Sequence, residues 1–166
     1  MGVTGTKDLQ RVIERISRFR TPQWRAGLSK NLAQEAQTQI VMGFAAQRDP
    51  YGRPWQPSRR AVSQGGQTLS DTARLRRSFS SPQSISRADE RGFEVGTNVR
   101  YAMAHQHGMT ITPKSKRFLA FKVNGRFVFA KKVVIPQRMM IPEGQLGPIW
   151  SGAFQRAASA YFTATP

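Results

Sequence analysis

The spacing of apolar residues changes twice along this chain, and this change most restricts the folds open to it. Between residues 7 and 47 apolar residues recur every three or four positions, which predicts amphipathic helices. Between residues 117 and 135 they form two short apolar runs on either side of Asn124-Gly125, the favoured turn of a two-residue β-hairpin. From Pro148 onward the helical spacing returns. Helices followed by strands and a final helix predict an α+β fold.

The N-terminal region is predicted to be a pair of amphipathic helices. The first covers residues 7–20, and the second runs from Pro22 to about Gln47. Thr21 is the expected N-cap of the second helix, because Pro22 then takes the first helical position, where its missing N–H costs nothing. The expected apolar stripes are Leu9, Val12, Ile13, Ile16 and Phe19 in the first helix, and Trp24, Leu28, Leu32, Ile40, Val41 and Phe44 in the second.

The next segment, residues 48–68, contains three Pro and three Gly and is predicted to be a long loop anchored by Trp55. A short helix is expected over residues 70–79, capped by Ser70 or Asp71 and burying Leu75 and Phe79. Further on, the sequence predicts a strand at 93–95, a helix at 101–107 ended by Gly108, and a small, mostly antiparallel sheet containing the hairpin. We expect one domain over 1–166, divided into helical region 1–47, loop 48–68, helix and β region 69–142, and C-terminal helix 143–166.

The composition excludes several kinds of site. The chain has no Cys, two His and nine acidic residues, so disulfides, thiol nucleophiles and thiolate metal cages are ruled out. His105 and His107 have no carboxylate near them in the sequence and are interpreted as structural or interface residues. Asp49 and Asp71 fit turn and cap positions better than an acid/base pair. We therefore expect no enzyme, metal or cofactor, since a nuclease would need clustered carboxylates.

The net charge of +17 favours a polyanionic partner, which leaves nucleic acid, an anionic membrane or an acidic protein surface open. No apolar run reaches the length of a membrane span, and the N-terminus has no signal core, so we expect no membrane partner and a role inside the cell or in something assembled there. Nineteen of the 26 cations are Arg, which suits fixed contacts to phosphate or carboxylate.

Many of the cations gather in loops or at the ends of elements, where they can face a partner without disturbing a core. With the loop residues around Trp55, the candidate contact residues are Arg53, Trp55, Arg59, Arg60, Arg74, Arg76, Arg77, Lys114, Lys116, Arg117, Lys131, Lys132 and Arg138. For Trp55 and Arg138, loop anchoring is the other role expected. The hairpin aromatics Phe118, Phe121, Phe127 and Phe129 are interpreted as core residues rather than base-stacking platforms.

Four segments, taken in order, resemble a known family. They are Asp49-Pro50-Tyr51-Gly52-Arg53-Pro54-Trp55-Gln56-Pro57, Leu69-Ser70-Asp71-Thr72-Ala73-Arg74-Leu75-Arg76-Arg77-Ser78-Phe79, Val95-Gly96-Thr97-Asn98-Val99-Arg100-Tyr101-Ala102 running on to His105-Gln106-His107-Gly108, and Ile135-Pro136-Gln137-Arg138. The set is similar to the virion morphogenesis proteins of tailed bacteriophages, also called tail-completion or head–tail joining proteins, over about residues 5 to 160. The chain departs from the family at Ala73, where Gly is frequent and where a helix would tolerate the change, and in its longer 117–134 hairpin.

The resemblance implies a structural virion protein of the neck or connector, assembled in the cytoplasm of the bacterial host. Such a subunit would complete the tail and join it to the DNA-filled head as part of a ring, with a hexamer as the expected form. The implied partners are further copies of the chain, other neck, connector and tail-terminator proteins, and double-stranded DNA in the channel. A basic nucleic-acid-binding protein that acts through phosphate contacts is the alternative function.

Overall fold

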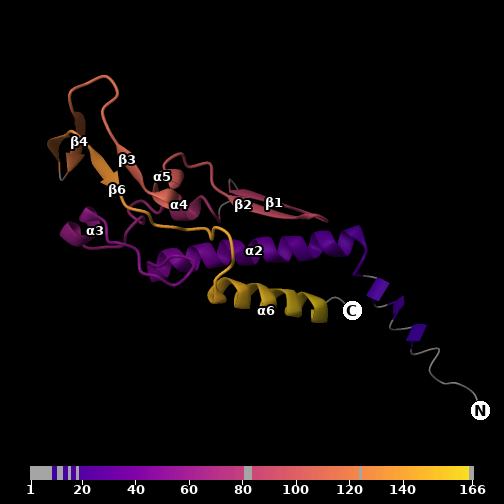
Figure 1. Ribbon diagram of the computed structural model, residues 1–166. Helices are drawn as coiled ribbons and strands as arrows, with labels where there is room; N and C mark the ends of the chain where they lie inside the picture. The colour runs from indigo at the N-terminus through magenta and orange to yellow at the C-terminus, as the bar shows by residue number, and fades with distance from the viewer. Residues whose placement is uncertain are drawn as a thin grey trace, which may run out of the picture.

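A computed structural model describes residues 9–10, 13–14, 16–17, 19–80, 84–123 and 125–164. Its named elements are α2 (Pro22–Ala46), α3 (Arg59–Gln64), α4 (Arg74–Arg77), β1 (Ile85–Asp89), β2 (Gly92–Gly96), α5 (Ala102–His107), β3 (Met109–Ile111), β4 (Leu119–Val123), β5 (Arg126–Ala130), β6 (Val133–Ile135) and α6 (Pro148–Ala164). The helices and the antiparallel strand pairs confirm the predicted α+β class (Figure 1).

The long helix α2 is the centre of the fold. Its N-terminus is as predicted: Thr21 has an extended backbone, its side chain accepts a hydrogen bond from the N–H of Trp24, and Pro22 is the first helical residue. The helix ends at Gln47, which takes a left-handed conformation. Helix α6 packs along one side of α2 and the β1–β2 pair packs against another, so that α2 lies between them (Figure 1).

The buried face of α2 differs in part from the predicted apolar stripe. Ile40 and Phe44 are buried as expected, but towards the N-terminus the buried residues are the small ones, Ser29, Ala33 and Ala36. Small side chains let neighbouring elements approach the helix closely, so they mark the buried face without bulky apolar residues. The core of buried residues is Ala36, Ile40, Phe44, Trp55, Leu75, Phe79, Val99, Ala102, Met140 and Trp150.

The first predicted helix, over residues 7–20, lies only partly within the described residues. Those described at 9–10, 13–14 and 16–17 are helical, and in Figure 1 they lie beyond the N-terminal end of α2. Leu9, Ile13 and Ile16 are each more than half exposed, so this part of the predicted stripe is not packed against the rest of the fold. Phe19, by contrast, contacts the rings of Trp24 and Phe162.

Two predictions between residues 48 and 79 need correction. The segment 48–68 is not entirely loop, because it contains α3, whose first turn is capped by the side chain of Ser58. The helix expected over 70–79 is reduced to α4, and neither Ser70 nor Asp71 caps it. Its N-cap position is Ala73, which makes no side-chain cap hydrogen bond. Leu75 and Phe79 are buried as predicted.

Ala73 has a φ of 55° and therefore lies in the left-handed region, so the expectation that Ala is easily tolerated there was wrong. For a residue with a Cβ this conformation has a free energy roughly 1–2 kcal/mol higher than a right-handed one, and glycine does not carry this strain. We expect Ala73→Gly to raise the free energy of unfolding by about 0.5–1 kcal/mol, after subtracting the entropy that glycine adds to the unfolded chain. Urea denaturation of both proteins measures this difference. An unchanged or lower midpoint would contradict the assigned backbone strain.

The strands form three separate antiparallel pairs, β1 with β2, β3 with β6 and β4 with β5. The predicted hairpin is confirmed: Val123 of β4 faces Arg126 of β5, and Gly125 between them has a φ of 77°. Asn124, the other predicted turn residue, lies outside the described residues. The predicted strand near 93–95 and the helix ended by Gly108 are also present. Strand β1 was not predicted, and it pairs with β2 across the turn that follows Asp89.

Candidate interaction surfaces

Trp55 and Arg138, two of the candidate contact residues, are 6% and 5% exposed and lie at the junction of two chain segments. The indole Nε1 of Trp55 donates a 3.0 Å hydrogen bond to the carbonyl of Met139, and Nε of Arg138 donates a 2.8 Å hydrogen bond to the carbonyl of Gln56. Each side chain thus bonds to the backbone beside the other, and we call this pair of contacts the clasp. Neither side chain is available to a partner, because both are buried and both hold the two segments together through these hydrogen bonds.

The clasp also includes His105, at the C-terminal half of α5. The backbone N–H of Arg138 donates to the carbonyl of His105, and the ring of His105 meets that of Tyr101 edge to face. Burial, and secondarily the charge of Arg138, lower the pKa of His105, so the imidazole is neutral near pH 7. Burial also lowers the pKa of Arg138, but an arginine pKa starts so high that the guanidinium remains charged.

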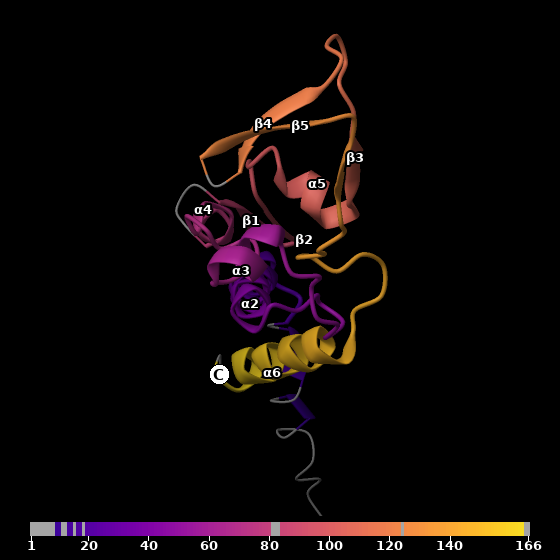
Figure 2. The ribbon, with the colours of Figure 1, turned by 90° about the vertical axis from the view of Figure 1, so that its left-hand side faces the viewer.

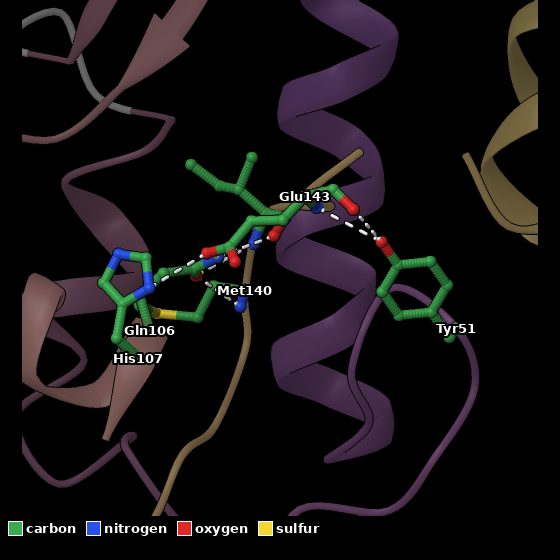
Figure 3. A network of polar contacts seen from close by, with 6 residues as sticks. Tyr51, Gln106, His107, Met140 and Glu143 are labelled. Carbon is green, nitrogen blue, oxygen red and sulfur yellow. Dashed lines mark hydrogen bonds and ion pairs between the residues drawn. The ribbon is translucent and has the colours of Figure 1, made fainter. Parts of the chain in front are cut away.

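A second polar network holds the segment after the clasp (Figure 3). The side-chain amide of Gln106 accepts from the N–H of Met140 and donates to the carbonyl of Ile141, so it bonds to that backbone as another strand would. The same amide donates to Glu143, whose carboxylate also lies 3.2 Å from Nδ1 of His107. On the other side, the hydroxyl of Tyr51 donates to the carbonyl of Glu143 at 2.6 Å. Residues 140–143 are thereby fixed between α5 and the loop after α2.

The candidate contact cations of the first half of the chain lie on or near α3 and α4. Arg53 and Arg59 are exposed, while Arg60 pairs with Asp71 at 3.6 Å and donates to the carbonyl of Gln67, which ties α3 to the segment before α4. In α4, Arg74 and Arg77 are exposed and Arg76 is half-buried. Among the described residues no carboxylate lies within ion-pair distance of these three α4 cations. Arg77 donates a 2.6 Å hydrogen bond to the carbonyl of Thr72, so of the three it is Arg74 whose exposed guanidinium is most accessible to an acidic or phosphate-bearing partner.

The remaining candidate contact cations, apart from Arg138, belong to a projection that we call the arm, residues 109–135. It begins with the β3–β6 pair, continues into the β4–β5 pair, and extends away from α2 and α6 (Figure 2). Lys114, Lys116, Arg117, Lys131 and Lys132 are all exposed. The register pairs Leu119 with Ala130, so the cations that precede β4 and those that follow β5 lie at the same end of this ribbon.

The aromatic residues of the arm correct another prediction. Phe127 and Phe129 are 65% and 66% exposed, and Phe121 is also exposed, so these three are not core residues. Phe118 is partly buried, with the guanidinium of Arg117 5.3 Å from its ring centroid. The sequence does contain a signal for this exposure: apolar residues alternate onto both faces of a hairpin that has only two strands. Such a ribbon has no interior of its own, and in the described residues no third strand or helix packs closely against β4 and β5.

Two of the described carboxylates, those of Asp49 and Asp89, stabilise turns. Asp49 accepts from the backbone N–H groups of Tyr51 and Arg53, as its predicted turn role requires, and Asp89 accepts from those of Arg91 and Gly92. Within the described ranges no group of three or more His, Asp or Glu could hold a metal ion. In the same ranges no helix is both long enough and apolar enough to cross a membrane.

An α+β fold with a projecting apolar arm and open basic clusters fits the class of structural and assembly proteins, which act through contacts with partners. The chain belongs to the phage virion morphogenesis family, whose model matches residues 5–146. This confirms the resemblance seen in the sequence, and the match includes both the clasp and the arm. The protein accordingly has a structural or assembly role in phage particles and contacts other virion proteins. No curated protein and no solved structure matches the chain.

Proposed function

We propose that this protein completes the phage tail and joins it to the DNA-filled head, as one subunit of an oligomeric ring at the neck. The observation that carries the proposal is the family match over residues 5–146, which assigns the chain to virion morphogenesis. The surface supports it, since a joining subunit needs regions that bind neighbours while its own core stays closed. Here the core cluster includes residues of α2, α4, α5 and α6 together with Trp55, and no described residue of the arm belongs to it.

The proposed ring is a hexamer with heterologous contacts, so each subunit presents two different surfaces to its two neighbours. The exposed cations near α3, those of α4 and those of the arm are the proposed contact residues, towards acidic neck proteins or the DNA in the channel. Trp55 and Arg138 take part indirectly, because the clasp fixes the loop that carries Arg53 and the segment that follows the arm.

The test is electron microscopy of a lysate made with a phage that carries a stop codon in this gene. We expect full heads and separate tails, because in the proposed scheme this subunit acts last, on a filled head and on a tail that lacks only its completing ring. Restoring the gene from a plasmid should restore joined virions, which controls for effects on neighbouring genes. Normal virions in the stop-codon lysate would refute the joining role.

The second candidate function is binding to nucleic acid through phosphate contacts, and the net charge of +17 favours it. If electrostatic binding to nucleic acid is the whole function, the purified protein should bind duplex DNA with an affinity that falls steeply as the salt concentration is raised. The same protein would then be dispensable for joining heads to tails. Filter binding at several salt concentrations, read beside the microscopy, separates the two functions.

A further inference from the structure

The arm has two apolar faces and covers neither of them. Phe127 and Phe129 alternate onto one face of the β4–β5 ribbon, and Phe121 and Val128, which are directly paired, lie on the other. All four residues are exposed. A ribbon of two strands without a covering layer is marginally stable in water, and exposed apolar patches of this kind mark interaction sites.

The charged side chains of the arm are all positive. Residues 114–132 contain seven Lys or Arg and no Asp or Glu, and the nearest acidic residues along the chain are Glu94 and Glu143. One of these cations, Lys122, places its Nζ 5.0 Å from the ring centroid of Phe127, so positive charge and aromatic surface occupy the same face. A partner that covers this ribbon must therefore offer apolar area and negative charge together.

We propose that the arm docks into another virion protein, on a surface that combines exposed apolar side chains with Asp and Glu. A second copy of the arm fits poorly, because two arms face to face would bring like charges together without any acidic residue to pair them. The rest of the chain does not cover the ribbon either, since β4 and β5 pack mainly on each other in the described residues. The outer edges of both strands are also unpaired there, so the partner can add a strand.

Nucleic acid fits the arm less well than a protein does. DNA takes cations along its phosphates, and a single-stranded partner would stack its bases on the face with Phe127 and Phe129. The opposite face carries Phe121, Val123 and Val128 beside one cation, Arg126, so most of this face is apolar side chain that phosphates cannot contact favourably. Burying both faces requires a partner that surrounds the ribbon with apolar side chains, as a protein groove does.

The first test places a photoreactive benzoyl-phenylalanine at position 127 of the full chain in phage-producing cells, with the same substitution at Met42 of α2 as the control outside the arm and outside the proposed basic contact clusters. Met42 is 56% exposed, so both probes reach solvent. We expect a crosslink from position 127, but little from position 42, to a virion protein through a peptide with more Asp and Glu than Lys and Arg. An adduct with a second copy of the chain, an adduct with DNA, or the absence of any adduct would overturn the proposal.

The second test uses joining of heads to tails as the readout and therefore rests on the proposed function. The double variant Phe127→Ser, Phe129→Ser should reduce joined particles by about tenfold or more, because it removes the central apolar contacts of the interface. Lys131→Glu combined with Lys132→Glu should do the same through charge. The control Met42→Ser, in α2, should join normally. Thermal unfolding of all variants should match the wild type, since every substituted side chain is exposed.

The two proposals fail in different ways. If the stop-codon phage still forms complete virions, the joining function is refuted. The crosslink from position 127 is then the test of whether the arm docks into another virion protein. If the stop codon separates heads from tails but the Phe127, Phe129 variant joins as the wild type does, only the arm proposal fails. If the Phe variant is defective and the Lys131, Lys132 reversal joins normally, the partner is apolar but not acidic, which overturns the proposed chemistry.

Discussion

Replacing Trp55 by alanine is expected to lower the free energy of unfolding by about 4 kcal/mol, among the larger losses for a single core substitution. Trp55 packs edge to face against Phe44 of α2, with ring centroids 5.3 Å apart, and both are in the core cluster. The substitution opens a cavity there and also removes the hydrogen bond to the carbonyl of Met139. Because that bond is half of the clasp, the loop from residue 48 and the segment from residue 136 should loosen together.

Trp55→Phe is the matched control, because it keeps most of the aromatic volume and removes the indole N–H. It should lower the free energy of unfolding by roughly 1–2 kcal/mol, because it removes the hydrogen bond and leaves a small packing defect. Urea unfolding gives the stability of the three proteins, and hydrogen exchange of residues 48–57 and 136–140 reports the loosening. If alanine costs no more than phenylalanine, Trp55 does not anchor the loop by packing.

Replacing Gly108 by alanine is the second substitution with a large expected effect, about 3 kcal/mol or more. Gly108 ends α5 with a φ of 73° and a ψ of 154°, a region open almost only to glycine. A Cβ there would also lie 3.1 Å from the backbone N of Gln137 and 3.2 Å from the carbonyl oxygen of Ile135. These are backbone atoms at the base of the arm, so the crowding can be relieved only by moving the strand that holds it.

Gly65 provides a control with nearly the same backbone conformation. It follows α3 with a φ of 75° and a ψ of 177°, but a Cβ at this position would meet nothing within 4 Å. Gly65→Ala should therefore show the conformational cost alone, about 1–2 kcal/mol. The difference between the two variants in chemical denaturation measures the crowding at the base of the arm. Equal losses of stability in the two variants would mean that the backbone around Gly108 can move to accommodate a Cβ at no cost.

Local signals in the sequence were sufficient for several elements. Thr21-Pro22 predicted the start of α2, the helical spacing after Pro148 predicted α6, and the two apolar runs around Asn124-Gly125 predicted the β4–β5 hairpin. In each case residues close in the chain determine the conformation, through capping, a turn or a repeating face. Such signals do not depend on what the element later packs against.

The features that escaped prediction depend on distant residues. Strand β1 has a single bulky apolar residue, Ile85, and exists because it pairs with β2. Ala73 is held in a left-handed conformation, although an isolated alanine favours a helix. Gln106 looks in sequence like any polar helix residue, yet its amide binds the backbone of residues 140–141. The exposure of Phe127 follows from the absence of a covering layer, which a hairpin motif cannot reveal.

The attachment of the arm has a consequence for how this protein can diverge among phages. Both ends of the arm enter the body next to each other, through the β3–β6 pair, and no described residue of the arm belongs to the core cluster. Mutations, insertions and deletions beyond that pair therefore escape the packing constraints that act on α2 and the clasp. One unchanged body can carry arms of different length and chemistry, so a change in the virion protein that the arm is proposed to bind can be matched by altering this segment alone.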